Sequence, residues 1–507
     1  MKPLGTITKY YPFLDSDTRE TLDTIMEEST NYYDFVVRLG KHVLEEKVSN
    51  SLAYLAAVHA WWTRARQITK ALDEKYENIP CVKPWTFLVI TAESSQALQY
   101  DSFKAALDIA LESVVDDWIR TELHVLHSLF HWPYLFDAPS QLRPLEEAKR
   151  LIGKNPKLQC FSPLVIFLES EARGKAGDCE GDVTGYDAAY RLVVESGDSV
   201  VEYMFRLVQA NYERHKNLGE SFRLFDELYT FAQDLGVASF QVEVLHDLSI
   251  SFEVAGEYDL AISSHLECIE MVGLSNPGID THYSLLSRHY ASLGNGMKAL
   301  EFADRVFESI GEVDYPTPYL RKARALVILC QLDQAEDFLA AAHSRMLKLA
   351  QEPRYIEYYY IYGNLELARG DLASAQDYLE QALEIAERLG RYLLYKNLIL
   401  LALARLELAQ TEESKDASER FMPGKWLSRL ENHVKSQDMP GIAIQTALIK
   451  SEFYQAYGQL KDARETLQQA LEISDSLGVK TLRAKVSKRI GELNRLIVEA
   501  GIKPDKR

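Results

Sequence analysis

Apolar and polar positions follow a helical period along most of the chain, and short turns interrupt the pattern. In residues 365–390 a Gly-Asp pair separates two helical stretches, and the second carries Leu372 and Leu379 on one face. Ala375 and Ala382 lie seven residues apart on that face, where larger side chains would bury more surface. Alanine at such positions lets helix backbones approach closely, so the pattern predicts helical pairs packed through small residues. We expect Ala375→Leu to overpack this contact at a cost of ~1 to 3 kcal/mol.

A turn residue followed five positions later by a small residue recurs through the downstream part of the chain. The turn residues are Lys216, Gly256, Gly294, Cys330, Gly370 and Gly458, and the small residues are Ser221, Ala261, Ala299, Ala335, Ala375 and Ala463. Successive turn residues are 40, 38, 36, 40 and 88 positions apart. The last interval accommodates one more unit, with a polar loop and a second helix from Lys425. The sequence therefore predicts seven helix–turn–helix units between residues 199 and 477.

The upstream part is also predicted to be helical, with a weaker repeat pattern. Asp and Ser capping residues precede the helical pattern of DSDTRETLDTIMEE, and residues 51–76 are expected to form one long helix. Residues 84–99 and 103–117 are expected to form a helical pair. No interval has the pattern of alternating strands or βαβ units, so the predicted fold class is all-α. The predicted regions are 1–118 (divergent helical), 119–198 (degenerate repeats), 199–477 (regular repeats) and 478–507 (capping helix and basic tail).

The best-defined unit resembles the tetratricopeptide repeat family in its order of large and small side chains. Tyr359, Tyr362, Gly363, Leu372, Ala375, Leu379 and Ala382 occupy the family's large, large, small, large, small, large and small positions. The resemblance covers about 280 residues and implies an α-solenoid, a right-handed superhelix of stacked helical pairs. The chain departs from the family in lacking most of the closing prolines and in having periods longer than the usual ~34 residues.

The resemblance also implies a concave binding surface. In this family the fifth and ninth motif positions of each first helix face a bound peptide, and the ninth positions here are Ala210, Ile250, Arg288, Arg324, Asn364, Arg405 and Glu452. The predicted binding residues, with the aromatic Tyr360 from a fifth position, are Arg288, Arg324, Asn364 and Arg405. Guanidinium groups bind carboxylates through paired hydrogen bonds, which favours an acidic or C-terminal peptide as the guest. Other fifth positions (Ser284, Leu320 and Leu401) depart from the family's carboxylate clamp. The alternative is that these arginines pair with acidic neighbours of the same protein.

The net charge indicates which classes of partner are disfavoured, and the cysteine spacing indicates a reducing compartment. The formal charge is 56 minus 75, or -19, with a pI near 5.2, which disfavours nucleic acid as a partner. The five cysteines (Cys81, Cys160, Cys179, Cys268 and Cys330) contain no CxxC pair. We therefore expect reduced thiols that act as small core residues in a cytoplasmic protein.

No membrane segment is predicted. The first residues contain no continuous apolar run of the kind found in a signal peptide. The most apolar window, residues 392–409, contains Lys396, Asn397, Arg405 and Glu407, which are costly in hydrocarbon. We expect this window to be a buried helix.

One histidine-rich stretch is a candidate for metal chemistry. His124, His127 and His131 have the i, i+3, i+7 spacing of one helical face, with Glu122 or Asp117 as a further candidate ligand. The HExxH motif differs in both spacing and its internal base, so a polar helix face is the favoured interpretation and no metal or other cofactor is predicted. The chain contains neither GxxxxGK[ST] nor GxSxG, and we expect no catalytic residues.

The C-terminal residues 480–507 form a basic patch, with nine Lys/Arg minus three Asp/Glu giving +6. This patch is expected to cap the solenoid, and it could also dock an acidic partner or the acidic body of the same chain.

These features favour a non-enzymatic scaffold or adaptor that binds a peptide or a protein segment in the concave groove. The alternative is a ligand-sensing regulatory protein with its output through residues 1–118. A metal-dependent hydrolase is the least favoured of the three.

Overall fold

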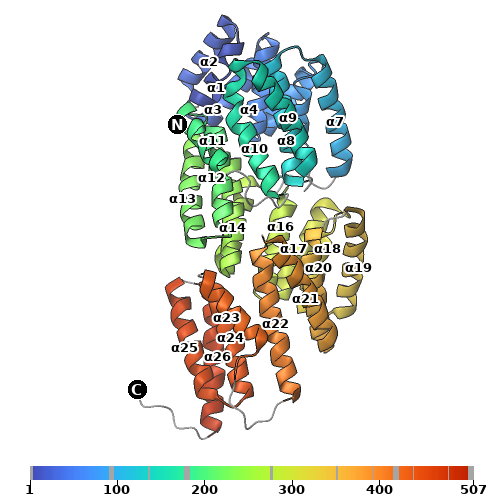
Figure 1. Cartoon of the computed structure of the whole chain (residues 1–507), viewed down its shortest axis with the longest axis vertical. Helices are drawn as coiled ribbons and strands as arrows, with labels where there is room; N and C mark the ends of the chain where they lie inside the picture. The colour runs from blue at the N-terminus through green and yellow to red at the C-terminus, as the bar shows by residue number, and fades with distance from the viewer. Residues whose placement is uncertain are drawn as a thin grey trace. The chain divides into compact units, whose positions relative to one another are not determined.

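The computed structural model describes residues 4–90, 96–134, 138–175, 183–273, 278–313, 315–349, 352–390, 392–414, 422–437, 439–477 and 479–500. All regular secondary structure in these ranges is helical, which confirms the predicted all-α class (Figure 1). The upstream helices are α1 (Leu4–Thr8), η1 (Tyr11–Phe13), α2 (Ser16–Glu28), α3 (Tyr32–Glu45), α4 (Asn50–Thr63), α5 (Arg66–Lys75), α6 (Lys83–Ile90), α7 (Gln96–Ser113), α8 (Asp117–Tyr134), α9 (Ala138–Lys154), η3 (Pro156–Phe161), α10 (Ser162–Lys175) and α11 (Val183–Ser196).

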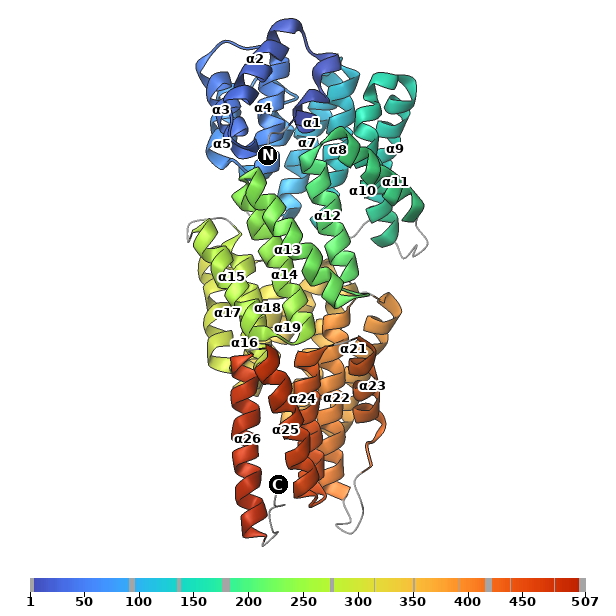
Figure 2. The ribbon, with the colours of Figure 1, turned by 90° about the vertical axis from the view of Figure 1, so that its left-hand side faces the viewer.

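In the described part of the chain seven pairs of helices follow, one for each expected unit, and a single helix comes last. The pairs are α12 (Ser199–Glu213) with α13 (Leu218–Leu235), α14 (Ala238–Ala255) with α15 (Tyr258–Val272), α16 (Ile279–Ser292) with α17 (Gly296–Ile310), α18 (Thr317–Ile328) with α19 (Leu332–Leu349), α20 (Glu352–Arg369) with α21 (Leu372–Leu389), α22 (Leu393–Ser414) with α23 (Lys425–Gln437), and α24 (Pro440–Ala456) with α25 (Leu460–Leu477). The single helix is α26 (Lys480–Glu499). Neighbouring helices pack side by side, as α24, α25 and α26 do in Figure 2. Stacked helical pairs of this kind are the solenoid architecture that the sequence predicts.

The chain forms two compact units. Unit 1 comprises Met1–Asn211 and Arg223–Val244, and unit 2 comprises Tyr212–Phe222 and Leu245–Arg507. These units are defined by spatial contacts rather than by repeat pattern. The sequence-based boundaries after residues 118, 198 and 477 therefore stay a prediction.

The turns between the paired helices use the left-handed backbone conformation. Positive φ angles occur at Gly256 (82°), Gly294 (73°), Cys330 (57°), Gly370 (86°) and Gly458 (71°). Glycine adopts this conformation without a steric penalty, which explains why it recurs at the turn positions found in the sequence. Cys330 occupies the same position with a side chain.

Small residues bring paired helices close together, as expected from the sequence. Ala375 and Ala382 of α21 have no exposed surface. A Cβ atom added at Gly363 of α20 would lie 2.7 Å from the Leu379 Cγ atom and 3.2 Å from the Ala375 carbonyl oxygen. The helix backbones therefore approach too closely at this point for a larger residue to fit without a shift.

The single long helix expected over residues 51–76 is wrong. The chain turns at Arg64, which has a φ of 53° and separates α4 from α5. The Arg64 N–H bonds to the Trp61 carbonyl at 3.1 Å, and the Ala65 N–H bonds to the Ala60 carbonyl at 2.9 Å. These bonds satisfy the last carbonyls of α4 in the manner of a helix C-cap. The turn separates α4, which is buried along most of its length, from α5, which buries only Thr69 and Leu72.

The predicted start of helix α2 is confirmed, whereas helix α7 starts earlier than expected. Asp15 caps α2 by accepting a hydrogen bond from the Thr18 N–H at 2.7 Å, which confirms the predicted helix start. Helix α7 begins at Gln96, before the expected start at residue 103. Residues 91–95, where the preceding helix was expected to continue, lie outside the described ranges.

Unit 2 closes on itself through contacts between residues far apart in sequence. Asn397 of α22 is fully buried and donates to the Val254 carbonyl at 3.1 Å. The Asp259 carboxylate accepts from the Thr481 N–H at 2.8 Å, although these residues are 222 positions apart. The last helix of unit 2 therefore packs against one of its first turns.

The apolar window from the sequence is the buried helix α22, as expected, with residues 398–404 buried. Over the described residues, the helices are too short or too polar to pass through a bilayer.

Candidate functional site

The predicted binding residues lie on the first helices of four consecutive repeats, and most are buried. Arg288 of α16, Arg324 of α18 and Tyr360 of α20 are 8%, 5% and 8% exposed. Asn364 is half-buried and Arg405 of α22 is exposed. The predicted residues therefore lie on successive first helices, but only Asn364 and Arg405 have more than a small exposed surface.

Arg288 is held by an acidic residue of the preceding repeat. Its Nε and Nη2 atoms donate to the two carboxylate oxygens of Glu253 at 3.0 and 2.5 Å. Burial raises the pKa of Glu253, but the charges of Arg288 and His289 outweigh burial and lower the pKa overall. This fork-to-fork pair is strong and specific. Arg288 therefore pairs with an acidic neighbour of the same protein, which is the alternative to peptide binding raised by the sequence.

A second buried ion pair joins Arg321 of α18 to Glu357 of α20. Their side chains are 3% and 1% exposed, and the Tyr395 hydroxyl donates to Glu357 at 2.8 Å. Burial is the main cause that lowers the pKa of Arg321 to about 9. The sequence reasoning missed this pair, although an acidic residue inside the apolar stretch IEYYYI was a usable signal for Glu357.

Arg324 differs from both neighbours because no carboxylate pairs with it among the described residues. Its Nη2 atom donates to the Ser292 hydroxyl at 2.9 Å, and its guanidinium carbon lies 5.3 Å from the centre of the Tyr360 ring. The buried Nη1 atom has no hydrogen-bond partner in the described part of the chain. Asn364 completes this group by donating to the Tyr360 carbonyl at 2.7 Å. The structure therefore brings together Arg324, Tyr360 and Asn364.

Arg405 lies close to the C-terminal helix. Burial is the main cause that lowers the pKa of Lys485 in α26, and the charge of Arg405 lowers it further. Lys485 also donates to the Leu293 carbonyl, and Arg483 of the same helix pairs with Asp475. The described part of the basic patch, α26, therefore docks on the body of unit 2.

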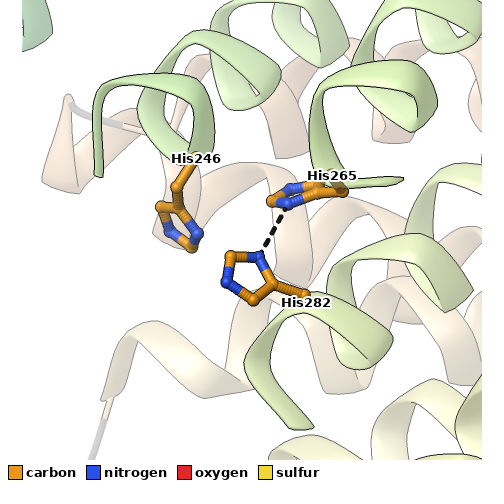
Figure 3. Close-up of side chains that lie close together, drawn as sticks. All are labelled: His246, His265 and His282. Carbon is orange, nitrogen blue, oxygen red and sulfur yellow. Dashed lines mark hydrogen bonds between the residues drawn. The ribbon is translucent and has the colours of Figure 1, made fainter. Parts of the chain in front are cut away.

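Three histidines from successive helices meet inside unit 2 (Figure 3). His246 of α14, His265 of α15 and His282 of α16 each place one ring nitrogen within 4.8 Å of the other two. His265 and His282 are buried, and His246 is half-buried. Burial is the main cause that lowers the pKa of all three rings, to about 4 for His282. No local sequence pattern indicates this cluster, because its members are 19 and 17 positions apart.

On α8, the acidic residues that were candidate metal ligands beside the predicted histidine face have other partners. Its candidate ligand Glu122 is buried and accepts from the hydroxyls of Tyr10 at 2.6 Å and Tyr54 at 3.1 Å. Asp117 lies 3.8 Å from Arg120. The described residues place His124 and His127 in half-buried positions, and the side chain of His131 lies outside the description. Both candidate acidic ligands are therefore engaged elsewhere.

The cysteines agree only in part with the expectation of small core residues. Cys81, Cys160, Cys268 and Cys330 are free thiols, and Cys179 lies outside the described ranges. Cys81 and Cys268 are buried, but Cys160 is half-buried and Cys330 is exposed. Cys330 is exposed because it occupies a turn between two helices.

Comparison with known proteins supports the repeat architecture. No family model matches the chain. The chain is 27% identical over 244 residues to tetratricopeptide repeat protein 29 of Trypanosoma brucei brucei, a match that covers 43% of this chain and 50% of that protein. The chain thus spans about half the length of the curated relative that it matches.

Solved structures overlap more loosely with the chain. A Rap protein complexed with competence and sporulation factor matches with a TM-score of 0.41 and 12% identity, covering 75% of this chain and 99% of that one. The Cut9–Hcn1 hetero-tetramer of the APC/C matches with a TM-score of 0.40 and 13% identity, covering 96% of this chain and 93% of that one.

The repeat pattern and the helical pairs of the described ranges define the class: the chain is an all-α helical repeat protein, and over 244 residues it is similar to a tetratricopeptide repeat protein. Such folds stack small helical units into extended surfaces, which supports a role in protein interaction.

Proposed function

We propose that the protein is a non-enzymatic adaptor that holds a segment of a partner protein against the first helices of the repeats in unit 2, α16, α18, α20 and α22, which we call the inner helices. A carboxylate of the partner would bind Arg324, and the ring of Tyr360 would contribute apolar contact. The observation that supports this function is that Arg324 is 5% exposed and has a buried Nη1 atom without a partner in the described chain.

The balance of buried charge favours an acidic guest. Arg288, Arg321 and Arg324 lie on neighbouring first helices, and two buried carboxylates, Glu253 and Glu357, pair with the first two. A buried cation without a partner is costly, so a carboxylate from outside would recover much of that cost. Its hydrogen bonds would be charge-assisted and directional.

The net charge of -19 opposes an acidic guest at long range. Salt screens exposed charges beyond roughly 8 Å at physiological ionic strength, whereas a buried guanidinium acts at contact distance. We therefore expect specificity to come from the Arg324 contact rather than from electrostatic steering. Side chains that now cover Arg324 must move, so association would be slower than to an open groove.

An array of synthetic peptides tests this function. Each peptide carries Asp or Glu, internally or at a free C-terminus, and is matched by a copy with Asn, Gln or a C-terminal amide. We expect the intact protein to prefer acidic copies and Arg324→Gln to lose that preference, with about 10- to 100-fold weaker binding, as for a charged hydrogen bond.

Arg305→Gln is the matched control. Arg305 also lies over an aromatic ring, 5.1 Å from the centre of Phe302, but it pairs with Glu301 on the exposed face of α17. Equal binding of acidic and neutral copies by the intact protein would contradict the proposal. An equal loss in both arginine variants would contradict it as well.

The cytoplasmic location and the exclusion of nucleic acid stay predictions from the sequence, based on the cysteine usage and the negative charge.

A further inference from the structure

The histidine cluster of unit 2 has the donor set and the spacing of a transition-metal site. Ring centres of His246 and His265 are 5.4 Å apart, and those of His246 and His282 are 5.9 Å apart. The Nδ1 atoms of His265 and His282 are separated by 3.2 Å. Zinc–nitrogen bonds of ~2.0 to 2.1 Å in a tetrahedron require nitrogens about 3.3 Å apart. Two of the three rings already have this spacing, and Figure 3 shows the third ring directed toward the same point.

A hydrogen bond behind the cluster leaves the His265 Nδ1 atom free to bind a metal. The Ser249 hydroxyl donates to the His246 carbonyl at 2.7 Å, and its oxygen lies 2.6 Å from the His265 Nε2 atom. Because the hydroxyl proton is directed to the carbonyl, the hydroxyl oxygen accepts the Nε2 proton of His265. The Nδ1 atom then presents its lone pair to the cluster. Metal-binding histidines are commonly fixed in this way by a partner on the other ring nitrogen.

A hydrogen bond between two neutral histidines would explain the contact of His265 with His282. It does not explain why a third imidazole, from a different helix, reaches the same point. His246 is half-buried whereas His265 and His282 are buried, so we place the fourth ligand position on the His246 side of the cluster. Three imidazoles and one open position form the ligand set of an open zinc site.

Nearby positive charges are compensated, so they do not exclude a cation. Arg288 is neutralised by the Glu253 carboxylate. Arg214 donates to the Ser251 hydroxyl at 2.9 Å and to the Asp247 carbonyl at 2.7 Å, and it lies 3.5 Å from the Asp247 carboxylate. His289, stacked on His265 with ring centres 5.2 Å apart, lies 3.4 Å from the Glu253 carboxylate.

From this geometry we propose that unit 2 binds a zinc ion through His246, His265 and His282, with water as the fourth ligand. Zinc prefers imidazole nitrogen, which distinguishes it from magnesium and calcium. The ion would join α14, α15 and α16, two adjacent repeats that precede the Arg324 group. The site does not depend on the peptide-binding function proposed above.

Metal titration of the full-length, tag-free protein tests this site. The protein is treated with a chelator, dialysed, and titrated with Zn²⁺ in competition with a chromophoric chelator. We expect one ion per chain, and absorption bands of tetrahedral Co²⁺ when cobalt replaces zinc. Absence of stoichiometric binding would overturn the proposal.

Variants separate this site from adventitious binding. We expect His246→Gln and His282→Gln each to weaken zinc binding at least ~100-fold, and Ser249→Ala to weaken it about 10- to 100-fold. His343→Gln is the control, because His343 is half-buried in the same unit and stacks on Tyr358 with ring centres 5.3 Å apart. It should bind zinc like the wild type, and an equal loss in this control would overturn the proposal.

Replacing a metal-binding histidine with cysteine, which also binds zinc, provides a second test if a glutamine variant fails to fold. His246→Cys should retain zinc, and its cobalt form should gain a thiolate-to-metal absorption band. Circular dichroism reports whether each variant keeps its helices. A folded His246→Cys protein that binds Co²⁺ without that band would show that residue 246 is not a ligand.

Discussion

At the scale of single residues, the interior of this repeat protein is distinguished by its buried polar side chains. The Arg288–Glu253 and Arg321–Glu357 pairs are almost completely buried. Buried ion pairs add little net stability compared with apolar packing, but losing one partner is severely destabilising. Arg324 has the environment of these arginines without their carboxylate, and for this reason it is the residue on which the proposed function depends.

Burial of a histidine in unit 1 predicts a pH dependence of stability. His59 is 1% exposed, and its Nδ1 atom lies 2.8 Å from the Tyr32 hydroxyl. Burial is the main cause that lowers the pKa of His59 from its ordinary value of about 6.5 to about 3. The unfolded chain therefore binds a proton as the pH falls through 6.5, whereas the folded chain does not. The stability contributed by neutral His59 is present above pH 6.5 and is lost as the pH falls toward 3.

Between pH 7 and pH 5 this residue should cost about 2 kcal/mol of unfolding free energy. Urea unfolding of the wild type and His59→Gln at both pH values measures the effect, and the variant should lose about 2 kcal/mol less over this interval. His215→Gln, which changes an exposed histidine, should retain the dependence of the wild type. A His59→Gln protein with the same dependence as the wild type would show that His59 is not buried in its neutral form.

The sequence could predict which residues occupy the inner helices but not what they contact. Arg288, Arg324 and Tyr360 were placed on the first helices because their motif positions repeat with the helical pairs. The partner of Arg288 comes from the preceding repeat, 35 positions away, and no local pattern encodes that pairing. The three-histidine cluster was missed for the same physical reason: its spacing depends on the rotation from one helix to the next.

At the scale of helices, packing is controlled by small residues and by turn geometry. The Gly363–Leu379 contact and the fully buried Ala375 confirm the close approach that the alanine pattern predicts. Helix α23 begins at Lys425, as expected. The break at Arg64 was not predicted, because a non-glycine residue in the left-handed conformation interrupts an otherwise continuous helical pattern.

Ala375→Leu tests the close packing of α20 against α21. The added side chain has no space between these helices, so we expect a loss of ~1 to 3 kcal/mol in unfolding free energy. Ala373→Leu is the matched control, because Ala373 lies on the same helix and is exposed. Chemical unfolding of both variants measures the difference, and equal stabilities would mean that the helices do not meet at Ala375.

At the scale of the molecule, the sequence could predict the helical pairs of residues 199–477, but it could not predict the closure of unit 2. Small rotations between neighbouring repeats accumulate along a solenoid, and their sum decides which distant helices meet. The contact of Asp259 with Thr481 depends on that sum. It makes α26 part of the body of unit 2, so the basic patch is partly used within the chain.

The proposed function requires that the inner helices of unit 2 contact the partner protein. Site-specific photo-cross-linking in the full chain tests it most directly, with a benzoylphenylalanine placed at Tyr360 and, as a control, at Leu347. Leu347 is 65% exposed on α19, whereas Tyr360 is 8% exposed and lies against Arg324. We predict that an acidic protein segment cross-links from position 360, much less from position 347, and not from position 360 when Arg324→Gln is also present. Cross-linking mainly from position 347, or from position 360 regardless of Arg324, would contradict the account.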